Sequence, residues 1–303
     1  MGFSGVSWAA DFVHLHVASA YSLRYGVASP AALVARAAQH GMRALALTDR
    51  DGLYGAIKHA VACQAAGVAP ILGVDLALAG EHMPVRPPRL GSENAVRVTL
   101  LASGGRGWAS LCRLVSAAHH AGERGAPAVT HDLVAEHTEG LTILLGPASD
   151  VGRAVSARRP DLAMTALGRW RERGDAVVEI TDHRGPGSTH RAARMLRLAR
   201  EAGRPAVLSN AVRYRDRADG PVAQVLDAAR QLAPLGPRHQ SRENSQAYLA
   251  SGADMARVAW VPRIGSATTP NETARTPAAI AKGIPARIPA LSESLRMVAH
   301  HIS

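Results

Sequence analysis

The chain contains 303 residues with a formal net charge of +11, and 47% of the residues are hydrophobic while 4% are aromatic. This length and hydrophobic content suffice for one large α/β domain, or two smaller ones, around an aliphatic core. No apolar run approaches the ~18 residues of a membrane span and no signal peptide is recognisable, so we expect a cytoplasmic protein without a membrane partner. The positive charge comes almost entirely from arginines spread along the chain, which supports DNA contact only weakly.

Short apolar runs alternate with longer helical patterns between residues 11 and 210. Seven of these runs are short, rich in leucine or β-branched residues, and bounded by Gly, Pro or Asp, as is typical of buried parallel strands. The predicted strands are Phe12–Val17, Ala44–Thr48, Pro70–Leu76, Val96–Ala102, Leu141–Leu145, Ala176–Ile180 and Ala206–Ser209.

Three predicted helices, Pro30–His40, Leu53–Ala66 and Thr189–Ala202, end at a glycine shortly before an apolar strand. Ser29 is the expected N-cap of the first, with proline following it. The repeated unit predicts an α/β fold, a distorted (β/α)7 barrel similar to a TIM barrel, with an open doubly wound sheet as the alternative. A further helix, Pro221–Leu232, follows the last strand.

The two ends of the chain differ in character from the predicted barrel. We expect residues 1–10 to form an N-terminal extension, residues 11–256 to form the domain, and residues 257–303 to form a loosely ordered tail. The tail is rich in Pro, Thr, Ala and Gly and lacks a helical or strand periodicity.

Active sites of parallel α/β barrels gather at the carboxyl ends of the strands. The first strand carries His14 and His16, which alternation would place on the same face. Such a pair is either a set of metal ligands or two core histidines satisfied by neighbours. Asp49 and Asp75 end the next two strands, where a carboxylate can bind a cation or cap a helix. The sixth strand is followed by His183.

The order of these segments resembles the PHP (polymerase and histidinol phosphatase) domain of the bacterial DNA polymerase III alpha subunit, over residues 11–256. Its most specific part contains, in succession, FVHLHVASAYS, GMRALALTDRDGLYGAIKHA and AGVAPILGVDL. The later segments VVEITDH and SNAVRY agree as well. The sequence Arg24-Tyr25-Gly26 is similar to an actinobacterial side branch of these polymerases.

The resemblance implies a metal site that this chain matches only in part. Active members bind a trinuclear cluster through His, Asp and Glu side chains, and some hydrolyse phosphoesters or proofread DNA. The matching residues are His14, His16, Asp49 and His183, with Asp75 in place of a Glu. The departures are Tyr25 and Ala211 in place of Asp, and Arg50, Arg97 and Arg213 in place of His.

Arginine stays protonated and has no lone pair for a metal. We therefore expect no cofactor, and ion pairs of the three arginines with Asp49, Asp75 or Asp182 in its place. The alternative is a single divalent ion, such as zinc or manganese, held by His14, His16 and His183.

The family places its polymerase active site in a palm domain beyond this region, and residues 257–303 do not resemble a palm. The resemblance implies a non-catalytic module that stabilises a polymerase, or docks a polymerase or proofreading subunit, in DNA replication or repair. Two alternatives remain open: a metal-dependent phosphoesterase, either histidinol-phosphatase-like or a 3'-5' exonuclease, and an interaction module acting in trans.

Overall fold

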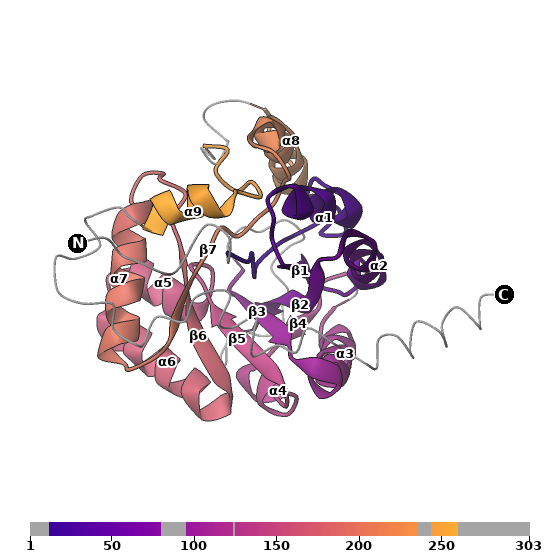
Figure 1. The fold of residues 1–303 in the computed structure, drawn as a ribbon. Coiled ribbons are helices and arrows are strands. Elements are labelled where there is room, and N and C mark those ends of the chain that lie inside the picture. Colours follow the sequence, from indigo (N-terminus) through magenta and orange to yellow (C-terminus); the bar gives the residue numbers. More distant parts are fainter. Residues whose placement is uncertain (1–11, 80–94, 124, 236–243, 260–303) are drawn as a thin grey trace, which may run out of the picture.

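A curled sheet forms half a barrel with helices on its outer side (Figure 1). The computed structural model describes residues 12–79, 95–123, 125–235 and 244–259, so the predicted extension 1–10 and the tail from residue 260 lie outside it. In the described ranges the sheet has the order β1-β2-β3-β5-β6-β7, with β4 paired to β2. The strands are β1 Ala44–Arg50, β2 Ala69–Leu78, β3 Arg97–Ala102, β4 Ala128–Val129, β5 Leu141–Leu145, β6 Asp175–Thr181 and β7 Ala206–Ser209.

The strand β3 runs antiparallel to both of its neighbours, β2 and β5. The prediction of parallel strands is wrong here, because a strand buried on both faces has the same apolar composition in either direction. The reversal has a consequence for the site. Arg97 begins β3 and pairs in register with Ala77 near the end of β2, so it lies where the neighbouring strand finishes.

The predicted first strand, Phe12–Val17, is an extended segment. Its one ladder contact with the described residues is the bridge between Val17 and Val212. Its backbone nevertheless bonds on both sides. Ala46 N donates to His14 O at 3.0 Å, and Val212 N donates to His16 O at 2.9 Å. The segment therefore joins β1 to the chain beyond β7, at the two ends of the sheet. The prediction of a distorted barrel is confirmed, and the alternative of an open doubly wound sheet is not.

Helices cover the outer face of the sheet (Figure 1). Three predicted helices agree with the structure to within one residue at each end, while α2 begins three residues later than expected. The domain boundary predicted after residue 256 falls inside α9. The bounds are α1 Pro30–Gln39, α2 Ala56–Ala66, α3 Gly104–Ala121, α4 His131–Ala135, α5 Asp150–Ser156, α6 Pro160–Arg173, α7 Ser188–Glu201, η1 Arg217–Asp219, α8 Gly220–Gln231 and α9 Gly252–Ala259.

Aliphatic side chains fill both faces of the sheet. One cluster packs helices against the outer face around the buried Trp170. A second cluster lies inside the curl, where Leu15, Leu101 and Val177 come from three separate segments. No helix in the described ranges is both long and apolar enough to cross a bilayer.

The N-cap of α5 provides a test of local stability. Ser149 is 1% exposed, its Oγ accepts from Gly152 N at 3.1 Å, and it donates to Gly146 O at 2.7 Å. We expect Ser149→Ala to lower the free energy of unfolding by about 1–2 kcal/mol. Ser29→Ala, at the exposed cap of α1, serves as the control and should cost less. Equal losses in urea denaturation would show that burial of the cap is irrelevant.

Candidate functional site

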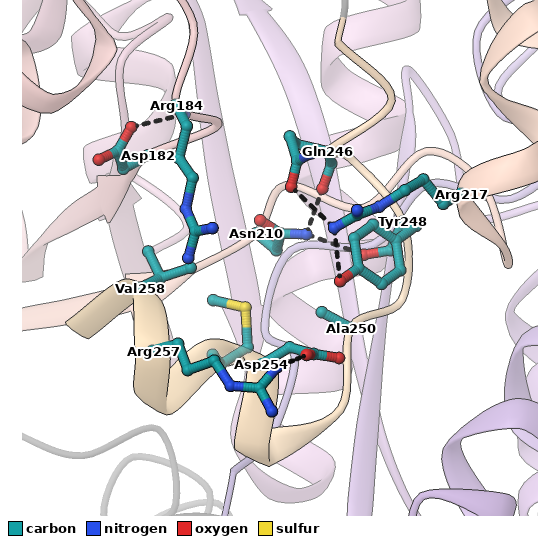
Figure 2. A pocket seen from close by; sticks show the side chains of 11 residues that line it. Asp182, Arg184, Asn210, Arg217, Gln246, Tyr248, Ala250, Asp254, Arg257 and Val258 are labelled. Carbon is teal, nitrogen blue, oxygen red and sulfur yellow. Dashed lines mark hydrogen bonds and ion pairs between the residues drawn. The ribbon is translucent and has the colours of Figure 1, made fainter. Parts of the chain in front are cut away.

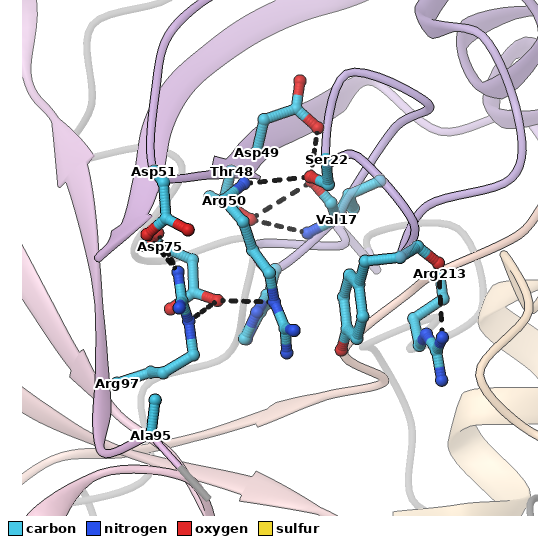
Figure 3. Close-up of polar contacts among 12 residues, drawn as sticks. Val17, Ser22, Thr48, Asp49, Arg50, Asp51, Asp75, Ala95, Arg97 and Arg213 are labelled. Atoms are coloured by element: carbon cyan, nitrogen blue, oxygen red, sulfur yellow. Dashed lines mark hydrogen bonds and ion pairs between the residues drawn. The ribbon is translucent and has the colours of Figure 1, made fainter. Parts of the chain in front are cut away.

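Charged side chains from three neighbouring strands meet at one end of the sheet (Figure 3). Arg97 Nε lies 2.8 Å from Asp75 Oδ2, and its Nη2 lies 2.8 Å from Asp51 Oδ1 and 2.6 Å from Asp75 O. Burial alone would lower the pKa of Arg97, but Asp75 and Asp51 outweigh this effect and raise it. The guanidinium is therefore a fixed cation, held from two sides.

Arg50 shares the same carboxylate and stacks on an aromatic ring. Its Nε lies 3.4 Å from Asp75 Oδ2, and its guanidinium carbon lies 3.2 Å from the centre of the Tyr25 ring. Burial is the largest influence on Arg50 and lowers its pKa. The predicted pairing with Asp75 is thus present for both Arg50 and Arg97. The ring of Tyr25 therefore fills the space beside the Arg50 guanidinium.

Arg213 approaches the other side of Tyr25, with its guanidinium carbon 4.1 Å from the ring centre. Its partner is Asp227 of α8, at 2.7 and 3.0 Å in a bidentate pair, and Arg230 Nη2 lies 2.6 Å from the same carboxylate. The prediction that Asp49, Asp75 or Asp182 would neutralise Arg213 is wrong. Asp227 lies one turn after Ala223 on the buried face of α8, which marks it as a buried acid but does not identify its arginine partner.

Asp49 and Asp182 make other contacts, and no arginine in the described ranges lies within ion-pair distance of either. Asp49 accepts from Ser19 N at 2.7 Å and from Ser22 Oγ at 2.8 Å, which anchors the loop after the first segment. Burial is the largest influence on Asp49 and raises its pKa. Asp182 accepts from the backbone of Arg184 and from Thr189 Oγ1.

The three histidines have three different partners. His14 Nε2 lies 2.8 Å from Ala250 O, and His183 Nε2 lies 2.8 Å from Asn210 O. A carbonyl oxygen only accepts, so both Nε2 atoms carry protons. Burial lowers the pKa of His14 to about 4.

His16 Nδ1 lies 2.9 Å from Glu179 Oε1 in β6, and the same carboxylate accepts from Ser209 Oγ. Burial would lower the pKa of His16, but the charge of Glu179 outweighs it and raises that pKa. Glu179 was not among the predicted site residues, although it stands on the inward face of β6 two residues after Val177. In the described part of the chain, no three His, Cys, Asp or Glu side chains form a group that could hold a metal ion.

Residues 14–183 match the PHP domain family. The chain belongs to that family. The error-prone DNA polymerase of Mycobacterium tuberculosis is 34% identical to it over 278 residues, covering 86% of this chain and 24% of the relative. The DNA polymerase III subunit alpha of Escherichia coli is 32% identical over 249 residues, covering 80% and 21%. This PHP domain chain thus spans about a quarter of the length of the curated relatives it matches.

Among solved structures, an amidohydrolase from Chromobacterium violaceum is similar to this PHP domain chain with a TM-score of 0.44 and 16% identity. The alignment covers 67% of this chain and 87% of that structure.

Proposed function

We propose that this PHP domain is a non-catalytic structural or partner-docking module of a protein related to the DNA polymerase III alpha subunit, acting in DNA replication or repair. One observation carries the proposal. Arg50 ends β1, Arg97 begins β3 and Arg213 follows β7. The resemblance implies a metal-binding histidine at each of these positions, and all three arginines form ion pairs.

The donor set does not fit a cluster of divalent ions. Three guanidinium cations would repel the metals, and they cannot lose a proton to become ligands. The Nε2 atoms of His14 and His183 donate to backbone carbonyls, which leaves only the Nδ1 lone pair of each ring as a metal ligand. The remaining acids are engaged as well: Asp75 by two arginines and Glu179 by His16. Without a metal-bound water, the usual nucleophile of such a phosphoesterase is missing.

The relatives' names support a partner within the replication machinery, and we propose a polymerase or proofreading subunit. Two helices expose apolar side chains on their outer surface that could make such a contact. They are Tyr54, Ile57 and Val61 at and near α2, and Val222 and Val225 on α8. The alternative function, metal-dependent phosphoesterase activity, would require a residual ion at His14, His16 and His183.

Elemental analysis combined with a hydrolysis assay tests the proposal. The chelator-washed protein should take up less than about 0.1 equivalent of zinc or manganese, and should not hydrolyse p-nitrophenyl phosphate or a 3'-tailed oligonucleotide in their presence. The matched control is the His14→Ala/His16→Ala variant, which should behave identically. Uptake of a full equivalent that this variant loses, together with metal-dependent hydrolysis, would establish the phosphoesterase instead.

A further inference from the structure

A cavity of about 370 Å³ lies beside α9, between the loop after β6, the residues after β7 and the segment 246–250 (Figure 2). It is separate from the arginine cluster, since none of Arg50, Arg97 and Arg213 lines it. Its polar wall includes Arg184, Arg217, Arg257, Asn210, Gln246 and Tyr248.

Two of these arginines have no carboxylate within ion-pair distance in the described ranges. Arg184 directs its side chain toward the cavity from a backbone with φ of 56°, which the bond from its N–H to Asp182 Oδ1 at 2.7 Å holds in place (Figure 2). Arg217 Nη2 contacts only neutral acceptors, Gln246 Oε1 and Tyr248 Oη, each at 3.2 Å. A guanidinium has five donors, so both arginines keep hydrogen atoms for a ligand.

The acids of the cavity are already engaged. Asp182 accepts from Arg184 N and Thr189 Oγ1, and Asp254 pairs with Arg257 Nη1 at 2.8 Å and accepts from Ser251 Oγ. Among the described residues, the lining therefore has three guanidinium groups against two carboxylates, and their net charge is positive.

The opposite wall of the cavity is firmly positioned. Asn210 Nδ2 donates to Gln246 O at 2.7 Å and to Tyr248 O at 2.8 Å. These two bonds fix the segment that contains Tyr248 to the end of β7. The Arg217 guanidinium carbon lies 4.9 Å from the centre of the Tyr248 ring, which orients this cation as well. The site is thus built before a ligand arrives.

We propose that this cavity binds the phosphate group of a small phosphomonoester. Planar guanidinium groups match the paired oxygens of a phosphate, and a cavity of this volume suits a ligand of mononucleotide size. The proposal does not depend on whether the arginine cluster at the strand ends binds metal.

Isothermal titration calorimetry at low salt, with inorganic phosphate and adenosine monophosphate as separate probes, tests the site. We expect Arg184→Gln and Arg217→Gln each to weaken binding about tenfold, and the double variant to weaken it further. The matched control, Arg171→Gln/Arg200→Gln, removes the same charge from exposed positions on α6 and α7 and should bind like the wild type. Tighter binding of the nucleotide identifies an ester as the ligand, whereas equal affinities identify the phosphate group alone.

A gain-of-affinity variant keeps the test independent of folding defects. Asp254→Asn removes one acid from the wall and releases Arg257 for the ligand, so it should tighten binding severalfold. Absence of saturable binding by the wild type at about 10 mM of either probe would overturn the proposal. Equal weakening by the control pair, or no gain from Asp254→Asn, would also overturn it, because the charge would then act at long range and not in the cavity.

Discussion

The Asp227→Ala variant should lose about 3–5 kcal/mol of its free energy of unfolding, because removing one partner of a buried ionic network costs far more than removing an exposed one. Asp227 contacts both Arg213 and Arg230, and the side chains of all three are at most 8% exposed. Without this carboxylate, two buried cations face each other and have lost the acid that they share. Urea denaturation at pH 7 measures the loss as a shift of the midpoint at constant slope.

Asp161→Ala is the matched control for Asp227→Ala. Its pair with Arg159 has a similar length of 2.7 Å, but both side chains are more than half exposed. It should therefore lower the free energy of unfolding far less than Asp227→Ala does, because solvent screens an exposed pair. Equal losses in the two variants would mean that the arginine network around Tyr25 contributes nothing particular to stability, and would weaken its proposed structural role.

Acidification from pH 7 to pH 4 should cost about 3 kcal/mol of stability through His59 alone. Burial, partly offset by the bond to Leu45 O, lowers the pKa of His59 to about 4 from 6.5. Between these two values the unfolded chain binds a proton that the folded chain excludes, so stability falls as the pH falls. Urea denaturation at pH 7, 5 and 4 should show this decline, with a smaller decline in His59→Gln.

Two other buried histidines, His14 and His16, change the stability with pH in opposite directions. His14 has the same depressed pKa of about 4 and adds to the acid loss, so the His59 variant retains part of the decline. His16 has a raised pKa, so its pairing with Glu179 stabilises the fold below pH 6.5 and is lost as the pH rises through the raised value. A wild type and a His59→Gln variant with parallel pH profiles would rule out a neutral, buried His59.

Local patterns were sufficient to predict most elements. Ser29 followed by Pro30 marked the start of α1, and the run Leu141–Leu145 matches β5, because caps and apolar runs act over a few residues. The direction of β3 left no such trace, since pairing partners far along the chain decide it. The composition of the first segment predicts a strand, yet its partners within the described part of the chain form only one bridge with it.

The site was predictable where it depends on neighbouring strand ends. Asp75 and Arg97 lie on adjacent strands, so their pairing followed from their positions. The pairing of Arg213 with Asp227 could not be predicted in this way. Asp227 reaches Arg213 from a helix whose packing angle the sequence does not encode locally. Glu179 was missed because a carboxylate within the strand VVEI reads as an interruption of a core pattern, until His16 is placed beside it.

The joining of the first segment to the last also sets the order in which the molecule can assemble. His14 Nε2 contacts Ala250 O across 236 positions of the chain, and His16 O accepts from Val212 N. Contacts this distant in sequence form slowly, because a long loop must close before they contribute. During synthesis, the side of the first segment that bonds to Val212 stays without its final neighbours until nearly the whole domain has left the ribosome. The half-barrel is therefore a late-closing fold whose first residues are among the last to be secured.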